Sequence, residues 1–194
     1  MRLFIPFILL LAGCTARNPQ KGLPDAVLME TARQGDAQAQ LHVAIAYDEG
    51  LDGVVENDAE AVYWYRQAAQ QGLAQAQNNL GVMYKDGTGV TQDYAEAARW
   101  FLMAARQGNV LAQSNIGFLY QTGLGVEQDY AAAYRWYLMA AARGHSSAQN
   151  NLGLLYRDGV GIPQNNDSAR YWLQLAARQG LSEAKRALKA MDEQ

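Results

Sequence analysis

The sequence predicts an all-α protein, a solenoid of four two-helix repeats with a capping helix at each end. The first observation is a period of about 36 residues, marked by glycines at positions 35, 72, 108, 144 and 180. The second is that each repeat carries one tryptophan, and these four are the only tryptophans in the chain. The third is a helical spacing of apolar residues within the repeat. Repeats of this length are typical of solenoids.

The first half of each repeat is predicted to be an amphipathic helix. In the second repeat Ala76, Leu80, Gly81 and Tyr84 follow one another at helical spacing, and their counterparts recur in the other repeats. Glycine inside a helix costs about 1 kcal/mol relative to alanine. Its recurrence therefore predicts that a neighbouring helix approaches there too closely for a side chain. The column consists of Ala44, Gly81, Gly117 and Gly153.

The second half of each repeat is predicted to be another helix, which begins after a good N-cap residue. Glu60 and Glu96, three residues beyond two of these caps, predict capping boxes. The glycine that marks each period ends the helix. The predicted caps are Asn57, Asp93, Asp129 and Asn165.

The chain divides into a leader, a linker, the repeats and two caps. Residues 24–35 are expected to form an N-terminal capping helix and residues 181–194 a C-terminal one, since repeat arrays need polar ends for solubility. Residues 1–13 have the layout of a secretory signal, with a positive start and an apolar run of nine residues, too short to span a bilayer. Residues 14–23 form the linker. The predicted repeats are 36–72, 73–108, 109–144 and 145–180.

Two stretches resemble known families. Leu11-Ala12-Gly13-Cys14 is similar to a bacterial lipobox, which implies that Cys14 is the lipid attachment site; Thr15 resembles the outer-membrane sorting pattern. The motif A-x-x-Q-x-N-L-G-x-x-Y-x-x-G-x-G-V, followed by D-Y-x-x-A-x-x-W-x-x-x-A-A, resembles the Sel1-like repeat, a relative of the tetratricopeptide repeat. It recurs over residues 36–180.

The Sel1-like resemblance implies a right-handed α-solenoid that acts as a binding scaffold and not as an enzyme. The first repeat departs from the motif. His42 replaces the asparagine, Ala44 replaces the glycine, and the loop from Gly50 to Gly53 has one extra residue. We therefore expect this repeat to dock less regularly.

Composition and motifs argue against several function classes. The net charge of −3 and the spread of charges leave no basic patch for nucleic acid. The Gly-x-Gly loops follow helices rather than strands, so we interpret them as left-handed helix ends and not phosphate loops. His42 and His145 are the only histidines, lie in different repeats and have no second cysteine nearby. We expect no metal, no cofactor, no catalytic residues and no enzymatic activity. The tryptophan column indicates packing between repeats.

Partner-binding residues are predicted where the repeats differ. Three columns of the first helix vary between repeats and lie on one stripe, at i, i+4 and i+7. In two-helix solenoids this helix lines the concave surface, where partners bind. The middle column is apolar, and two interpretations stay open: it completes the core, or it is an exposed ridge. The stripe comprises Leu41, Ile45 and Asp48; Asn78, Val82 and Lys85; Ser114, Phe118 and Gln121; and Asn150, Leu154 and Arg157.

The sequence predicts a lipid-anchored, protein-binding protein of the bacterial envelope, at the outer membrane and facing the periplasm, that engages an envelope protein. The alternative is an immunity protein that neutralises an antibacterial phospholipase-type effector in the periplasm. Short Sel1-repeat lipoproteins resemble such inhibitors. Sequence alone separates the scaffold from the inhibitor poorly.

Overall fold

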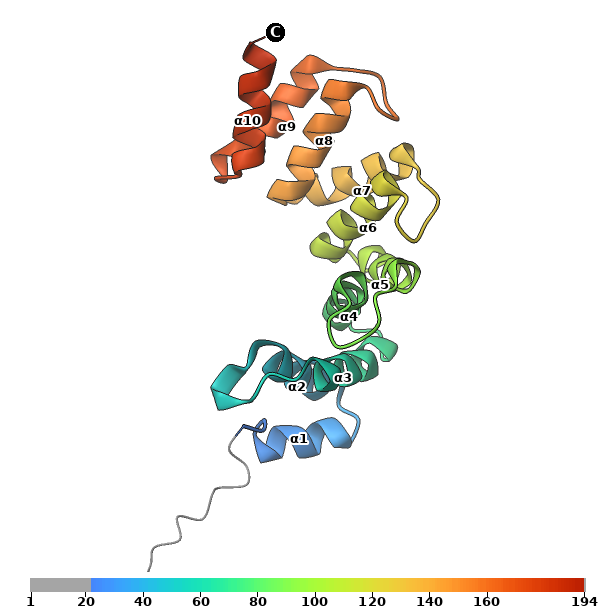
Figure 1. Cartoon of the computed structure of the whole chain (residues 1–194), viewed down its shortest axis with the longest axis vertical. Helices are drawn as coiled ribbons and strands as arrows, with labels where there is room; N and C mark the ends of the chain where they lie inside the picture. Colours follow the sequence, from blue (N-terminus) through green and yellow to red (C-terminus); the bar gives the residue numbers. More distant parts are fainter. Residues whose placement is uncertain (1–21, 194) are drawn as a thin grey trace, which may run out of the picture.

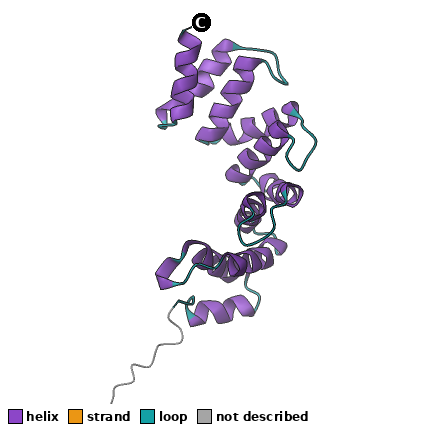
Figure 2. Cartoon of the chain, in the orientation of Figure 1, coloured by secondary structure: helices purple, strands orange, loops and turns teal. Residues whose placement is uncertain are grey.

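The computed structural model describes residues 22–193, and within them every regular element is helical (Figure 2). Cys14 and the predicted signal peptide lie outside the described residues. None of the helices in 22–193 has the length and hydropathy needed to cross a membrane. The elements are α1 (Ala26–Arg33), α2 (Ala37–Glu49), η1 (Leu51–Gly53), α3 (Asp58–Gln70), α4 (Ala74–Asp86), α5 (Tyr94–Arg106), α6 (Val110–Thr122), α7 (Tyr130–Ala142), α8 (Ser146–Asp158), α9 (Asn166–Arg178) and α10 (Ser182–Asp192).

The helices stack in chain order into an elongated, curved array, with α1 at one end and α10 at the other (Figure 1). We call α2, α4, α6, α8 and α10 the A helices, and α1, α3, α5, α7 and α9 the B helices. Each A helix packs against the B helix that precedes it, and α2, α4, α6 and α8 also pack against the B helix that follows. The predicted all-α solenoid of two-helix repeats is confirmed.

The core is a row of four hydrophobic clusters rather than a single centre. The first three clusters each take a tryptophan from the next B helix along the chain. Trp100 of α5 packs in the cluster of α1 to α4, Trp136 of α7 packs against that of α5 and α6, and Trp172 of α9 against that of α7 and α8. The prediction that the tryptophans pack between repeats is confirmed.

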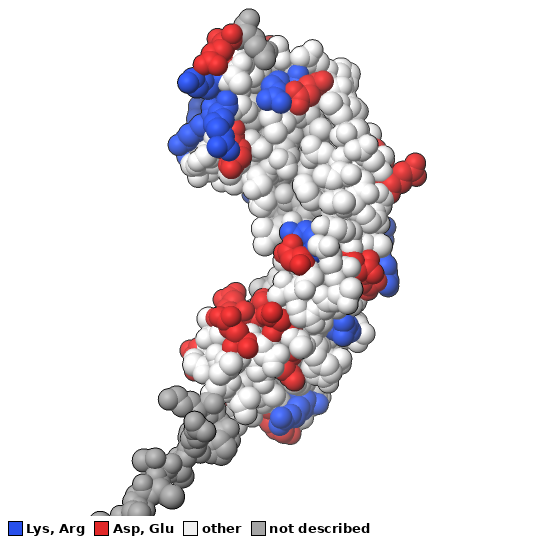
Figure 3. Space-filling model, in the orientation of Figure 1, with Lys and Arg blue, Asp and Glu red and all other residues white. Residues whose placement is uncertain are grey.

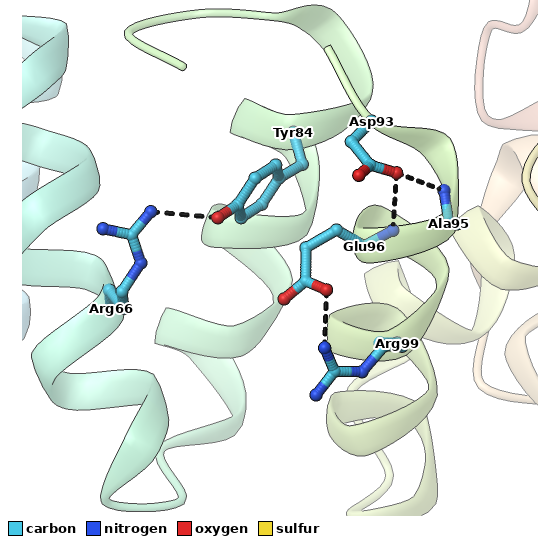
Figure 4. Close-up of polar contacts among 6 residues, drawn as sticks. All are labelled: Arg66, Tyr84, Asp93, Ala95, Glu96 and Arg99. Atoms are coloured by element: carbon cyan, nitrogen blue, oxygen red, sulfur yellow. Dashed lines mark hydrogen bonds and ion pairs between the residues drawn. The ribbon is translucent and has the colours of Figure 1, made fainter. Parts of the chain in front are cut away.

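The B helices of the four repeats begin at the predicted N-caps, and Figure 4 shows the cap of α5. Asp93 accepts hydrogen bonds from the backbone N–H groups of Ala95 and Glu96, at 2.9 and 3.0 Å. The capping box predicted for Glu96 is wrong, because its carboxylate pairs with Arg99 at 2.6 Å. The N–H of each cap already donates to a tyrosine carbonyl of the preceding A helix, which leaves nothing for the glutamate to bind. These caps are Asn57, Asp93, Asp129 and Asn165, and the carbonyls belong to Tyr47, Tyr84, Tyr120 and Tyr156.

The glycines inside the A helices face an aromatic or leucine side chain of the following B helix. A Cβ on Gly117 would lie 2.8 Å from the ring of Tyr137, and one on Gly81 would lie 2.7 Å from the ring of Phe101. The predicted close approach is therefore confirmed, with a side chain rather than the helix backbone as the main contact.

The Gly-x-Gly loops connect the A and B helices of one repeat and contact the repeat before it. The first glycine of each loop ends the A helix in the left-handed conformation, as Gly123 does with φ of 73°. The second glycine also has positive φ and lies directly on the backbone at the start of the preceding B helix, as Gly125 does on Tyr94. The loops are thus structural, as predicted. They tie each repeat to the one before it.

A ladder of buried glutamines also joins the repeats. Each repeat has an A-helix glutamine that donates to a carbonyl near the end of the preceding B helix. Its side-chain oxygen accepts from a second glutamine after the next B helix, except where Arg143 stands in that place. Arg143 donates to the carbonyl of Gly108 instead. In the described part of the chain, Gln113 Oε1 is consequently a buried acceptor without a partner. The A-helix glutamines are Gln40, Gln77, Gln113 and Gln149.

The first repeat departs from the others in its loop, as expected. The extra residue is accommodated by η1, where Asp52 adopts a positive φ of 54°. Gly53 has no non-neighbouring atom within 4 Å of its Cβ position, unlike Gly89, Gly125 and Gly161. This repeat therefore lacks the glycine contact that ties the other repeats to a preceding B helix.

His145 is the N-cap of α8, and this role makes the stability of the protein depend on pH. Its Nδ1 accepts the N–H of Ala148 at 3.2 Å, and burial lowers the pKa of the imidazole. The unfolded pKa is about 6.5, so the stability is complete above that pH and decreases as the pH falls through the lower folded pKa. The reason is that the protonated ring no longer accepts this hydrogen bond and places a positive charge at a helix N-terminus.

We expect His145→Asn to flatten the pH dependence of the unfolding free energy below about pH 6.5. Asn109 caps α6 at the equivalent position, where it accepts from Ala112 at 2.9 Å, so asparagine preserves the cap without titrating. Urea unfolding of both proteins between about pH 7.5 and 4.5 would test this. Parallel curves for the two proteins would contradict it.

Candidate functional site

The predicted binding stripe lies on the A helices, and the structure separates its three columns by burial. The column with Leu41, Asn78, Ser114 and Asn150 is buried, with exposed fractions of 4, 4, 7 and 6%. The prediction that this column faces a partner is wrong. Leu41, for example, packs within the hydrophobic cluster of α1 to α4.

Asparagines form the polar contacts of this buried seam. Asn115 of α6 donates to Asn78 Oδ1 of α4 at 3.1 Å. The corresponding donor for Asn150 is missing, because Ala187 of α10 occupies that place, and within the described residues Asn150 Oδ1 is buried without a partner. The variation in this column therefore reflects contacts between repeats.

The sequence left two interpretations of the middle column open, a core position or an exposed ridge. Different members of the column fit each of them. Ile45, Val82 and Leu154 are half-buried and pack against the hydrophobic clusters. Phe118 of α6 is different, because 41% of it is exposed and it belongs to none of the four clusters. Phe118 is thus the one member of this column that offers a large apolar side chain to a partner.

The third column is half-buried, and two of its members hold buried tyrosines. The hydroxyl of Tyr65 donates to Asp48 Oδ2 at 2.8 Å, and that of Tyr137 donates to Gln121 Oε1 at 2.7 Å. Burial raises the pKa of both tyrosines, and the hydrogen bond and charge of Asp48 raise the pKa of Tyr65 further. Asp48 and Gln121 therefore have a structural role, whatever else they contact.

The other two members of this column lie in repeats whose B helix has no hydroxyl at the equivalent position. Phe101 and Leu173 occupy the places of the two tyrosines, and in these repeats the column holds Lys85 and Arg157. Each of these cations pairs with the aspartate next to it, at 3.2 Å and 2.6 Å respectively. Residue type in this column thus follows the B-helix partner.

A shallow cavity of about 230 Å³ lies between the ends of α2 and α4. It is lined by Asp48, Glu49, Asn79, Val82, Met83 and Thr88. Two of these residues belong to the predicted stripe. Sequence reasoning missed the other four, Glu49, Asn79, Met83 and Thr88, although the adjacent acids at the end of the first A helix were a visible signal.

Charge is distributed unevenly along the array. Residues 34–65 contain seven acidic residues and no lysine or arginine. Figure 3 shows acidic side chains gathered on the inner side of the curve, over the end of α2 and η1. Cations gather instead at the far end, over α10, where Lys185, Arg186 and Lys189 lie.

The described residues contain no cluster of three metal-ligating side chains. His42 is exposed on α2, and His145 caps α8, so the two histidines lie three repeats apart. The α2–α4 cavity combines the carboxylates of Asp48 and Glu49 with the apolar side chains of Val82 and Met83. Such a surface is suited to binding.

Comparison with known proteins gives the same picture. The Sel1 repeat family matches residues 37–73, 74–109, 110–145 and 146–181. The crystal structure of c5321, a protective antigen of uropathogenic Escherichia coli with an SLR fold, is 37% identical with a TM-score of 0.80 over 85% of this chain and 35% of that one. None of the curated proteins matches the chain in sequence.

Two further structures share the fold. A Sel1 repeat protein from Oxalobacter formigenes is 37% identical, with a TM-score of 0.74 over 81% of this chain and 65% of that chain. Immunity protein Pa5087 from Pseudomonas aeruginosa is 22% identical, with a TM-score of 0.52 over 81% of this chain and 58% of that one. The chain thus spans about one third and just under two thirds of the two more similar proteins. Four consecutive repeat matches, together with these two relatives, show that the chain belongs to the Sel1 repeat family.

Proposed function

We propose that this chain is a non-enzymatic, lipid-anchored protein of the bacterial envelope that binds a protein partner through the surface of its A helices. Sel1 repeats generally mediate protein–protein interaction. The observation that carries the proposal is Phe118, an exposed aromatic side chain in the middle of a helical array whose equivalents are half-buried. Aromatic residues at the centre of an interface contribute much of its binding energy.

The anchor part of the proposal rests on the sequence around Cys14. A linker from Cys14 to Pro24 reaches at most about 35 Å when fully extended. The array would therefore stay close to the membrane, which we take to be the outer membrane on its periplasmic side. Several acyl chains would give stable attachment.

An inhibitor is the second candidate. The chain shares its fold with an immunity protein. A membrane-tethered binder would also be placed where an antibacterial phospholipase-type effector acts. A scaffold is expected to bind resident envelope proteins, whereas an immunity protein binds one toxic enzyme tightly and blocks its activity. The scaffold and the inhibitor would use the same binding surface and differ in the protein that binds there.

We expect Phe118→Asp to weaken partner binding by more than tenfold, since a buried interface aromatic contributes about 2 kcal/mol or more. The unfolding free energy should change by less than about 1 kcal/mol, because the side chain lies outside the clusters. Affinity capture from cell lysate and secreted fractions, with mass spectrometry and a lipase assay on the captured protein, would measure the first effect. Far-UV circular dichroism and melting would measure the second.

Met139→Asp is the matched control, since Met139 is 49% exposed but lies on a B helix. Capture that survives Phe118→Asp but fails with Met139→Asp would place the partner on the other face. Capture of a lipase whose activity falls on binding would select the inhibitor. Capture of resident envelope proteins would select the scaffold.

A further inference from the structure

The carboxylates of the first repeat lack cationic partners. None of the ion pairs found within residues 22–193 involves an acid from residues 36–60. In the later repeats Asp86, Glu96, Asp129 and Asp158 are all paired with lysine or arginine. Carboxylates without an ion pair are therefore concentrated in the first repeat, although Asp93, Glu127 and Asp167 of the later repeats also make none within the described residues.

The end of α2 concentrates this negative charge. Asp48 and Glu49 are its last two helical residues, and its last turn contains no basic residue. The C-terminus of a helix already carries partial negative charge, so carboxylates there are unfavourable unless a cation approaches. Lys85 and Arg157 occupy the place of Asp48 in α4 and α8, where they complement the helix dipole. In the first repeat an acidic residue, Asp48, stands where these two repeats have a basic one.

The cavity between α2 and α4 combines the two carboxylates with apolar and neutral polar groups. Val82 and Met83 form its apolar part, while Asn79 and Thr88 supply an amide and a hydroxyl. Lysine and arginine side chains bury their methylene stems against apolar surface and keep the charged head among polar groups. A cavity of about 230 Å³ has room for such a side chain.

We propose that the protein partner inserts a lysine or arginine side chain into the α2–α4 cavity, with its charged end between Asp48 and Glu49. This inference rests on the proposed function and adds the chemistry of the partner, a basic segment that faces the first repeat. The Tyr65 hydroxyl donates to Oδ2 of Asp48, so the other carboxylate oxygen, Oδ1, is left to accept a hydrogen bond from the charged group of the partner. The apolar wall formed by Val82 distinguishes this site from one for a bare metal ion.

The test uses two probe peptides of equal length, tandem copies of Ala-Lys-Ala-Arg and of Ala-Glu-Ala-Asp, each with a fluorescein label at the N-terminus and an amidated C-terminus. Binding to the purified chain is measured by fluorescence anisotropy at about 50 mM and about 300 mM salt, which brackets the screening of exposed charges. The wild type should bind the basic probe, more weakly at high salt, and should not bind the acidic probe.

The decisive variant is Asp48→Asn with Glu49→Gln, because asparagine keeps an acceptor for Tyr65 while both charges are removed. We expect it to bind the basic probe at least tenfold more weakly than the wild type. The control is Glu127→Gln with Asp167→Asn, which removes two exposed charges from distant repeats and should change binding by less than twofold. Equal losses in both variants, or no binding of the basic probe, would overturn the inference.

This outcome is separable from that of the proposed function. If Phe118→Asp abolishes partner capture while Asp48→Asn with Glu49→Gln leaves both capture and probe binding unchanged, the binding function stands and the basic contact is wrong. If neither change affects capture, the A-helix surface itself is the wrong site.

Discussion

Gly125→Ala is expected to destabilise the protein by about 3 kcal/mol or more, through strain and overpacking together. A Cβ at this position would lie well inside van der Waals contact with the carbonyl group of Tyr94 and the nitrogen of Ala95. Because these are backbone atoms at the start of α5, no side-chain rotation relieves the overlap. The positive φ of 69° adds a further cost for any residue with a Cβ.

Gly144→Ala separates the two causes. Gly144 has a positive φ of 89°, but nothing lies within 4 Å of its Cβ position. The cost there should be about 1 kcal/mol, the price of a left-handed conformation alone. Urea unfolding with a common m-value would measure both variants. Similar losses in the two proteins would show that the contact between repeats contributes nothing beyond backbone conformation.

Gln121→Lys is expected to cost about 2 kcal/mol, because it leaves the buried hydroxyl of Tyr137 without an acceptor. Adding Tyr137→Phe should recover most of that loss, since the double variant recreates the Phe101 and Lys85 pair of the second repeat. The free energies of unfolding of the two single variants and the double variant form a cycle that measures the coupling.

Gln38→Lys serves as the control for this cycle, because Gln38 is exposed on α2 and the same change there should be nearly neutral. Additive effects of Gln121→Lys and Tyr137→Phe would mean that the 2.7 Å contact between these side chains has no energetic weight. The third column would then be free to vary for binding, as the sequence alone suggested.

The fold was predictable because its signals are repeated. A spacing of about 36 residues, a glycine inside each later A helix and an N-cap before each B helix all indicate the same two-helix unit. The capping boxes were not predictable, because the N–H groups they would use are bound to carbonyls of another helix, such as that of Tyr84. A cap residue can be recognised from its neighbours in the sequence, whereas the competing carbonyl belongs to another helix and is known only from the tertiary structure.

The candidate site was only partly predictable, because variation between repeats has two causes. Asn78 and Ser114 differ yet both are buried, and Asn78 accepts a hydrogen bond from Asn115 of the next A helix. Asp48 and Gln121 vary with the tyrosines they bind. Phe118 is free of such an explanation, and its exposed fraction of 41% was needed to distinguish it.

The contact between Gly125 and the start of α5 makes each repeat an exchangeable cassette. Gly89 lies on Asp58 in the same way, one repeat earlier. Deleting residues 74–109 in register would therefore bring Gly125 onto Asp58, with every kind of joint preserved. Gain or loss of a whole repeat would therefore change the length and curvature of the inner surface, and with them the size of the partner that fits there. The packing within each remaining repeat would stay the same.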